Sequence, residues 1–330
     1  MKNSIKSKPV ISYLIITFLI TYLLWFSPVV LELATDLKFA ILILGGCGPL
    51  IGAYIVLLLQ SESKIKIHSI KLFLLFFSLA FGAIYLDLYS MGLEGSGEDD
   101  FKPSLNEVGL ISWILIVLFC FITALILSNA KNPQLKENFI TSILPVKSKV
   151  KWYIIGLLLF PILAIFSYAI GQMIGFEVTD YLFKIEMAWI LGVMSIMISA
   201  GYEEFGWRGL MQKDLQKRRS PLITALIIAF FWNAWHLPMH YNGFYSTGGI
   251  MDLIPALVFT IPLTIIFTWL YNKSKYSILA VFLLHGIHNS FQGIVGSSDF
   301  LFFILMVLFA IFLVVKNKMW KKKDFNSYIE

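Results

Sequence analysis

The sequence predicts an all-α protein, a polytopic transmembrane helical bundle of about ten spans with both termini in the cytoplasm. Two observations predict this fold: the apolar composition and the placement of the basic residues. Of the 330 residues, 58% are hydrophobic and only 14% are charged, and the mean hydropathy is +0.80. A soluble chain of this length would expose many more charges. No alternating pattern typical of a membrane barrel occurs, so we expect the spans to be helices.

Ten apolar segments are long enough to cross a bilayer, which takes about 20 residues at a rise of about 1.5 Å each. The first follows a basic stretch but is too long for a signal peptide, so we expect it to remain as an anchor. In chain order the segments are residues 10–32, 39–60, 72–92, 108–129, 152–174, 187–210, 221–237, 253–271, 276–293 and 298–315.

The basic residues support the same topology independently. With a cytoplasmic N-terminus, ten crossings place most of the 26 Lys and Arg residues in the inner loops and tails, as the positive-inside rule requires. The net charge of +6 therefore reflects topology and attraction to membrane lipid, and it gives no support for nucleic-acid binding. We expect an integral membrane protein of a prokaryotic plasma membrane.

Ionisable residues divide the chain into two parts. Residues 1–150 are N-terminal transmembrane helices without a motif, whereas residues 151–330 hold nearly all the polar groups expected inside the membrane. A charged group at the centre of a bilayer costs about 2.5–3.5 kcal/mol on insertion scales, so such groups are functional candidates. The candidates are Glu203, Glu204, Arg208, His236, His240, His285, His288 and Asn289.

The first motif contains two adjacent glutamates, Glu203 and Glu204, followed by Arg208. On an α-helix Glu204 and Arg208 are i,i+4 neighbours and can form an ion pair. Glu203 is rotated by about 100° and lacks a local counter-ion, which is the profile of a general base or a proton carrier. The alternative is that the helix ends at the membrane interface and both acids reach water.

The second and third motifs supply histidines. His236 closes the seventh span, and Pro238 limits how far that helix continues. Because Pro238 also separates His236 from His240, a helical metal-binding pair is not expected there. In the ninth span His285 and Asn289 are i,i+4 neighbours on one helix face. The alternative for that pair is a hydrogen-bonding role between helices.

The three motifs are expected at overlapping depths in the membrane. Counted from the cytoplasmic boundaries, Glu203 and His285 lie about 14 Å deep and His236 about 22 Å deep. A glutamate and a histidine can activate water while histidine and asparagine donors stabilise an oxyanion, which suffices to hydrolyse an amide. Two histidines and one glutamate are also a ligand set for catalytic zinc. The residues alone do not choose between these mechanisms.

In order and spacing, these motifs resemble the EExxxR, FxxxH and HxxxN motifs of the CAAX-protease and bacteriocin-processing family. That family of intramembrane endopeptidases includes the type II CAAX prenyl endopeptidases. The resemblance covers about residues 187–295. Two departures occur: Trp232 stands where the family has a phenylalanine, and the ten expected spans exceed the eight that are usual for the family core.

The resemblance implies a hydrolase that cleaves a peptide or membrane-protein substrate near the membrane. By position, its catalytic residues would be Glu203, His236, His285 and Asn289. The first two would activate water, the last two would form the oxyanion site, and Glu204 with Arg208 would be a structural ion pair. In metalloprotease accounts of the family, Glu203, His236 and His285 would hold a divalent metal such as zinc. A metal-independent mechanism stays open.

Two other classes of protein stay open as well. A proton-coupled transporter would also use an uncompensated glutamate, histidines and helix breaks such as Pro255 and Pro262, although no inverted repeat is evident. A non-enzymatic immunity or scaffold protein could keep the same fold. The scaffold would tolerate Glu203→Ala and His285→Ala without loss of phenotype, whereas a protease would not.

Overall fold

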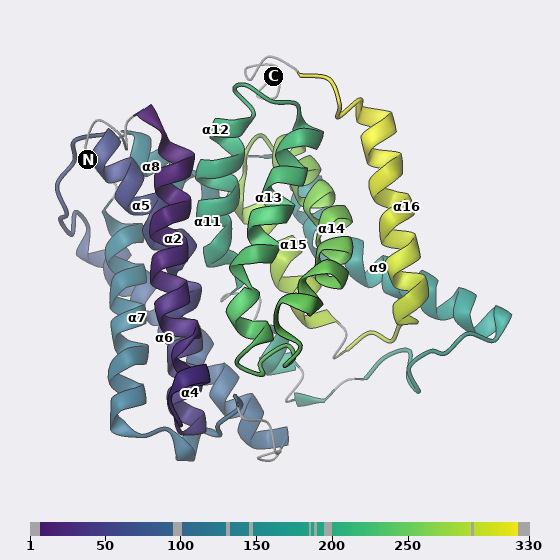
Figure 1. The fold of residues 1–330 in the computed structure, drawn as a ribbon, viewed down its shortest axis with the longest axis horizontal. Helices are drawn as coiled ribbons and strands as arrows, with labels where there is room; N and C mark the ends of the chain where they lie inside the picture. Colours follow the sequence, from purple (N-terminus) through teal and green to yellow (C-terminus); the bar gives the residue numbers. More distant parts are fainter. Residues whose placement is uncertain are drawn as a thin grey trace.

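The chain is a bundle of helices (Figure 1). The computed structural model describes residues 7–94, 101–129, 133–144, 148–184, 186–187, 190–194, 200–291 and 294–322. Within these ranges the extended pairing is limited to one isolated bridge between Phe183 and Val295. The longer helices are α2 (Pro9–Trp25), α4 (Thr35–Gly46), α5 (Gly48–Gln60), α6 (Ile70–Glu94), α7 (Leu110–Ser128), α9 (Val150–Ile174), α13 (Pro221–Trp235), α14 (Leu253–Lys273), α15 (Ile278–Ser290) and α16 (Asp299–Asn317).

The helical membrane bundle predicted from the sequence is confirmed, with differences in the length of its spans. Seven segments of the described chain are long and apolar enough to cross a membrane. The predicted spans 221–237 and 276–293 correspond instead to α13 with 15 residues and α15 with 13. These two helices are about 22 and 20 Å long, shorter than a hydrocarbon core of about 30 Å. The predicted span 187–210 lies partly outside the described residues, so the number of crossings stays a prediction.

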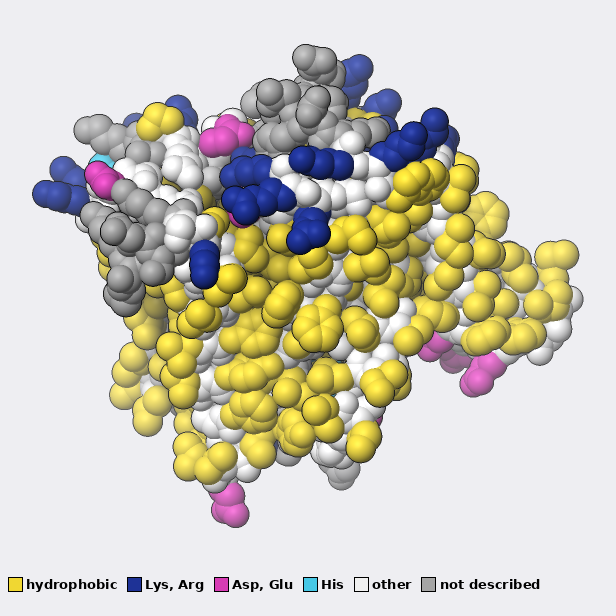
Figure 2. Space-filling model, turned by 45° about the horizontal axis from the view of Figure 1, so that its top comes forward, with side chains coloured by type: hydrophobic (Ala, Val, Ile, Leu, Met, Phe, Trp, Pro, Cys, Tyr) yellow, Lys and Arg dark blue, Asp and Glu magenta, His cyan; other side chains and the backbone are white. Residues whose placement is uncertain are grey.

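The ends of the bundle differ in charge. In Figure 1, α2 begins and α16 ends at the same edge of the molecule. Figure 2 shows dark blue Lys and Arg side chains along this edge and a broad apolar surface below it. This separation fits the expected basic cytoplasmic side, although which side faces the cytoplasm stays a prediction. We call this edge the basic face of the bundle.

Small residues let the N-terminal helices pack closely. Gly48 and Gly52 lie four residues apart on α5, against α2. A Cβ atom at either position would collide with a threonine of α2, Thr21 or Thr17 respectively. Glycines at this spacing allow two helix backbones to approach each other inside a membrane. This contact fixes α2 in place beside α5.

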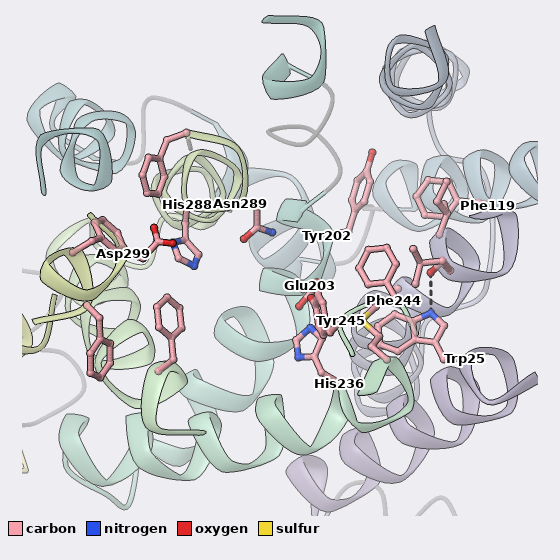
Figure 3. Close-up of a pocket in the computed structure, with 18 residues that line it drawn as sticks. Trp25, Phe119, Tyr202, Glu203, His236, Phe244, Tyr245, His288, Asn289 and Asp299 are labelled. Carbon is pink, nitrogen blue, oxygen red and sulfur yellow. Dashed lines mark hydrogen bonds between the residues drawn. The ribbon is translucent and has the colours of Figure 1, made fainter. Parts of the chain in front are cut away.

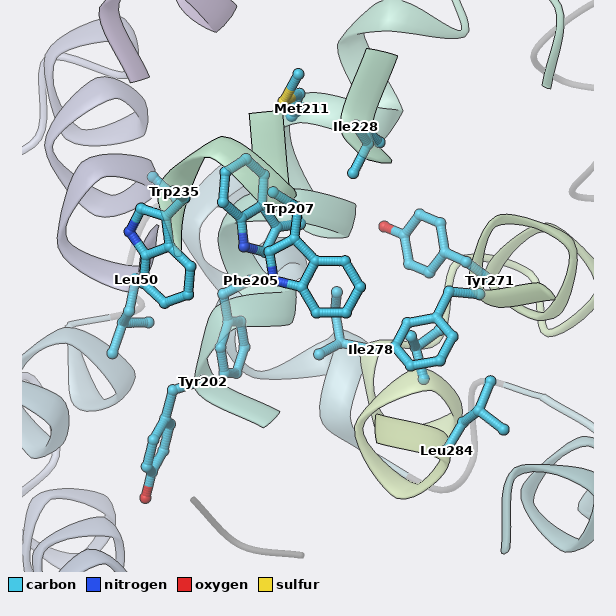
Figure 4. Packing of buried hydrophobic residues seen from close by; sticks show 14 of the residues in the cluster. Leu50, Tyr202, Phe205, Trp207, Met211, Ile228, Trp235, Tyr271, Ile278 and Leu284 are labelled. Carbon is cyan, nitrogen blue, oxygen red and sulfur yellow. The ribbon is translucent and has the colours of Figure 1, made fainter. Parts of the chain in front are cut away.

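A cluster of tryptophans joins the N-terminal helices to the motif-bearing half. Trp25 of α2 and Trp235 of α13 have ring centroids 4.5 Å apart, and Trp207 lies 6.1 Å from Trp235. Each of the three side chains is at most 2% exposed. Figure 4 shows Trp207 and Trp235 side by side in this core. Residues on both sides of the predicted boundary at 150/151 therefore share one packed core, and the boundary itself stays a prediction.

Candidate active site

The first motif lies on a short segment whose helix type changes three times. It begins as a 3-10 turn (Ala200–Glu203), continues as α11 (Glu204–Gly206) and then forms a π-helix (Trp207–Gln212) before α12 (Lys213–Leu215). A π turn widens the helix and frequently occurs at functional sites. The regular α-helix assumed from the sequence is therefore wrong for this segment, although the i,i+4 neighbours still meet.

Glu204 is at the centre of a fully buried polar network. The Nε of Arg208 donates to Glu204 Oε2 at 2.9 Å, and both side chains are 0% exposed. On its other oxygen, Glu204 accepts a hydrogen bond of 2.8 Å from the Nδ1 of His285 on α15. The predicted ion pair is present in the structure, and it also holds His285. Because its Nδ1 faces a carboxylate, the His285 ring has its other nitrogen, Nε2, for a further partner.

Arg208 is stabilised by aromatic rings as well as by Glu204. Its guanidinium lies 5.2 Å from the ring centroid of Phe267 and 5.7 Å from that of Trp232. Its Nη1 and Nη2 atoms have no hydrogen-bond partner among the described residues. A cation between two desolvated rings gains cation–π attraction, which offsets part of the free-energy cost of leaving these two buried donor atoms without partners. Arg208 thus depends strongly on the one carboxylate that it contacts.

Glu203 has a different environment from its neighbour. It is partly exposed, and its Oε2 accepts a hydrogen bond of 2.8 Å from the indole Nε1 of Trp232 on α13. In the sequence, Trp232 is only a departure from the phenylalanine of the family motif. An indole carries an N–H donor that a phenyl ring lacks, so this departure adds a direct partner for the candidate base.

His236 is placed by the end of α13. That helix ends at Trp235, and a 3-10 turn that includes Pro238 follows, η6 (Leu237–His240). The Nδ1 of His236 lies 2.9 Å from the backbone oxygen of Trp232, an acceptor, so Nδ1 carries the proton and donates. The neutral ring therefore has Nε2 as an acceptor. As expected, His236 and His240 do not share one regular helix.

The residues of the third motif lie on α15. His285 is buried, whereas Asn289 is exposed and lines the cavity described below. His288 packs between Phe160 and Phe259, at centroid distances of 4.7 and 5.8 Å. Its Nδ1 is buried and has no hydrogen-bond partner within the described chain. No role was predicted for His288, and these ring contacts account for its position.

One cavity gathers the predicted catalytic residues. A cavity of about 340 Å³ is lined by Glu203, His236, His285 and Asn289, which come from three separate elements. A second cavity of about 810 Å³ shares Glu203, His236 and Asn289 and extends between aromatic side chains. Figure 3 shows Glu203, His236 and Tyr245 close together, with Asn289 and His288 projecting from α15. The shared depth predicted from the sequence thus corresponds to a shared space, and the catalytic roles stay predictions.

The N-terminal helices contribute to this space. Trp25 of α2 and Leu42 of α4 line the larger cavity, and the Nε1 of Trp25 donates to the backbone oxygen of Leu42 at 2.9 Å. The helices that carry no motif are therefore part of the cavity wall. The sequence carries no signal for this contribution, because apolar residues that line a cavity resemble any other residues of a membrane span.

The three candidate metal ligands line one cavity, and metal binding by them stays a prediction. Over the ranges that the structure describes, no three His, Cys, Asp or Glu side chains are gathered closely enough to hold an ion. His285 is bonded to Glu204 and Glu203 to Trp232, so each has a protein partner. Each bond engages one atom of the side chain, and such outer partners also occur around bound metals. The ligand set Glu203, His236 and His285 stays a prediction, and we derive no step through a metal.

A second polar group at the cavity has partners that were not predicted from the sequence. His240 lines the smaller cavity and is bonded to Ser246 at 2.9 Å, and Ser246 is bonded to Asp252. Tyr245 lines both cavities, and its ring lies 5.6 Å from those of His236 and His240. The spacing from His240 to Asp252 has no regular period, so only the folded loop brings these residues together.

Comparisons with known proteins bear on this site. Residues 185–291, which contain all three motifs, match the family model described as Type II CAAX prenyl endopeptidase Rce1-like. A protein of Methanococcus maripaludis named CAAX prenyl protease 2 is 24% identical over 244 residues, which cover 71% of this chain and 86% of that protein. These findings confirm the resemblance to the type II CAAX prenyl endopeptidases and indicate an intramembrane endopeptidase of that type.

Proposed function

We propose that the protein is an intramembrane endopeptidase in which Glu203 and His236 activate the water molecule that cleaves a peptide bond. The observation that carries the proposal is the single cavity lined by Glu203, His236, His285 and Asn289. The family match over residues 185–291 supports the same chemistry. Its setting would be the plasma membrane of a prokaryote, with a peptide or membrane protein as substrate.

Water activation is the first step of the proposed reaction. The Glu203 carboxylate is held by the Trp232 indole and borders the cavity, and His236 presents its Nε2 as an acceptor. A water molecule between them would give a proton to Glu203 as its oxygen bonds to the substrate carbonyl carbon. Glu203 would then pass this proton to the leaving nitrogen as the carbon–nitrogen bond breaks. The base is thereby regenerated in each cycle.

Asn289 and His285 of α15 would stabilise the oxyanion. The Asn289 amide is a hydrogen-bond donor that lines this space. His285 is held by Glu204 through Nδ1, so its charged form has Nε2–H to donate as well. Donors that are already oriented by the protein stabilise the negative charge of the transition state without further reorganisation. Removal of one such donor typically costs about 10²–10³ in kcat.

A comparison of peptide termini in membranes tests the proposal and identifies substrates. Membranes that contain the wild-type protein or Glu203→Gln are compared at matched expression, and we expect termini that depend on Glu203. Loss of a general base typically lowers the rate by about 10²–10⁴-fold. Asp214→Asn is the matched control, because it makes the same carboxylate-to-amide change outside both cavities of the active site.

Each outcome of this comparison has a definite meaning. Termini that appear with the wild type and Asp214→Asn but not with Glu203→Gln support the protease. Identical termini from all three proteins, each inserted at the same level, would contradict it. In that case the transporter or the scaffold would be the better account of the polar residues.

A further inference from the structure

The loop between α13 and α14 contains a chain of hydrogen bonds. The Nδ1 of His240, at the end of η6, lies 2.9 Å from the hydroxyl oxygen of Ser246. Ser246 donates to Oδ2 of Asp252, at the end of a second 3-10 turn, η7 (Gly249–Asp252). The same oxygen accepts from the backbone N–H of Gly248 at 3.1 Å. An imidazole, a hydroxyl and a carboxylate are thus connected by consecutive hydrogen bonds.

The two ends of this chain have different surroundings. The His240 side chain is 9% exposed and lines the cavity that contains Glu203 and His236. The Asp252 side chain is 37% exposed. In Figure 1 the loop lies at the end of the bundle opposite to the basic face. The chain therefore leads from the buried cavity to a carboxylate at the opposite face.

Other hydrogen bonds of the cavity end inside the protein. Glu203 is bonded to the Trp232 indole, and His236 to the Trp232 backbone oxygen; neither partner exchanges protons readily. His285 is bonded to Glu204, whose side chain is fully buried. Among the side-chain hydrogen bonds described for this cavity, that of His240 continues to a carboxylate that is more than a third exposed.

We propose that His240, Ser246 and Asp252 form a proton relay that connects the cavity with the aqueous face opposite to the basic one. The inference rests on the proposed protease function and assigns these three residues a role in that reaction. His240 is then a relay and positioning residue, which acts on protons and not on the substrate itself.

The proton balance of the relay is simple. Ser246 donates to Asp252, so its oxygen accepts from Nδ1–H of His240, and Nε2 is the acceptor of the neutral ring. Hydrolysis leaves a carboxylic acid in the cavity, and its proton moves to Nε2 of His240. The Nδ1 proton then moves to Ser246, the Ser246 hydroxyl proton moves to Asp252, and Asp252 releases a proton to water. One proton has left the cavity and the ring ends neutral with its proton on Nε2, so this proton must return to Nδ1 before the next cycle.

The surroundings of His240 favour the neutral form of its imidazole ring. Burial lowers the pKa of His240 from its ordinary value, while the nearby Asp252 carboxylate opposes this shift. Tyr245 packs against the ring at 5.6 Å. The other titratable groups that line the same cavity are Glu203, His236, His285 and His288.

The test separates proton transfer from hydrogen bonding alone. In His240→Asn the side-chain amide can still donate to Ser246, but it does not titrate. With a peptide substrate identified by the termini comparison, we measure kcat and KM over a range of pH. We expect kcat to fall about tenfold, below the full range of a direct acid or base, with KM unchanged and a flattened pH profile.

Ser246 provides the matched pair of variants. Ser246→Ala breaks the chain and should show the same loss in kcat as His240→Asn, whereas Ser246→Thr keeps the hydroxyl and should behave as the wild type. Added imidazole should raise the kcat of His240→Ala toward that of the wild type. A purely structural defect would not be rescued by imidazole. Thermal unfolding in detergent checks that each variant is folded.

The alternative outcomes distinguish the relay from the protease. If His240→Asn and Ser246→Ala keep the wild-type kcat and pH profile, the relay is wrong while cleavage that depends on Glu203 still stands. A rise in KM at constant kcat also overturns the relay, because it assigns the loop to substrate binding. If the wild type shows no cleavage that depends on Glu203, the proposed function is wrong and the relay is wrong with it.

Discussion

Two adjacent glutamates belong to polar networks of opposite character. Glu204, with Arg208 and His285, is fully buried and bonded on both oxygens. Glu203 is partly exposed, bonded to Trp232, and borders the cavity with His236. The charge of Glu204 is compensated within the protein, whereas Glu203 faces the space where a substrate would lie. Side chains of identical chemistry are therefore expected to be structural at one position and reactive at the next.

Trp232 is the boundary between the two networks. Its ring contacts those of His285 at 5.3 Å and His236 at 5.9 Å, and its face lies 5.7 Å from the Arg208 guanidinium. Its indole N–H bonds Glu203 and its backbone oxygen accepts from His236. One residue thus packs against the buried ion pair and orients both candidate water-activating residues, Glu203 through its side chain and His236 through its backbone.

The largest expected effect on stability comes from Glu204→Gln. A neutral amide leaves Arg208 without its counter-ion in a fully buried site, and His285 loses its charged acceptor. Breaking a buried pair by removing one partner typically costs about 3–5 kcal/mol. We expect a lower folded yield and a clear drop in the unfolding temperature, measured by thermal shift in detergent.

Glu203→Gln is the matched control for that measurement. It makes the same chemical change one residue earlier, where no ion pair is lost, so we expect an unfolding temperature near that of the wild type. Equal destabilisation by the two variants would mean that the stability of the fold depends no more on the Glu204 carboxylate than on that of Glu203.

A smaller effect is expected from Trp232→Phe, which restores the residue type of the family motif. The ring is kept, but the hydrogen bond of 2.8 Å to Glu203 is lost. A hydrogen bond to a charged group contributes about 1.5–3 kcal/mol, so kcat/KM should fall about tenfold or more. Steady-state cleavage of an identified peptide by the folded protein measures this.

Trp235→Phe is the control for the loss of an indole N–H. Trp235 is also buried and donates at 2.8 Å, but to Thr21 of α2 and not to a residue of the cavity. Its loss should lower stability by about 1 kcal/mol and leave the specific activity of folded protein close to that of the wild type. If both variants lose activity equally, Trp232 acts through packing and not through Glu203.

The sequence predicted the bundle well because long apolar runs have few alternatives inside a membrane. It missed features that depend on tertiary contacts. The π-helix at Trp207–Gln212 and the short α13 and α15 leave no clear trace in hydropathy. The first of these follows a glycine, Gly206, where a Cβ would come within 2.6 Å of the Pro49 backbone oxygen. Such a close approach can be recognised only in the folded chain.

For the site, the sequence identified residues but not all of their partners. The ion pair of Glu204 with Arg208 could be predicted because the two residues are four positions apart. The bond from His285 to Glu204 spans 81 positions and that from Trp232 to Glu203 spans 29, so neither has a local signal. His240 was considered only as a metal partner of His236, and its bond to Ser246 was not foreseen.

The smallest effect is expected from removal of divalent metal ions, and it sharpens the comparison of the two networks. No three of the described His, Cys, Asp or Glu side chains are gathered closely enough to hold an ion, and the proposed reaction has no step through a metal. Purified protein treated with a chelator should therefore cleave its peptide at the untreated rate, with Glu203→Gln inactive in both conditions. Loss of cleavage that zinc restores would instead mean that Glu203, His236 and His285 hold an ion, which would supply Lewis-acid activation of water at this cavity.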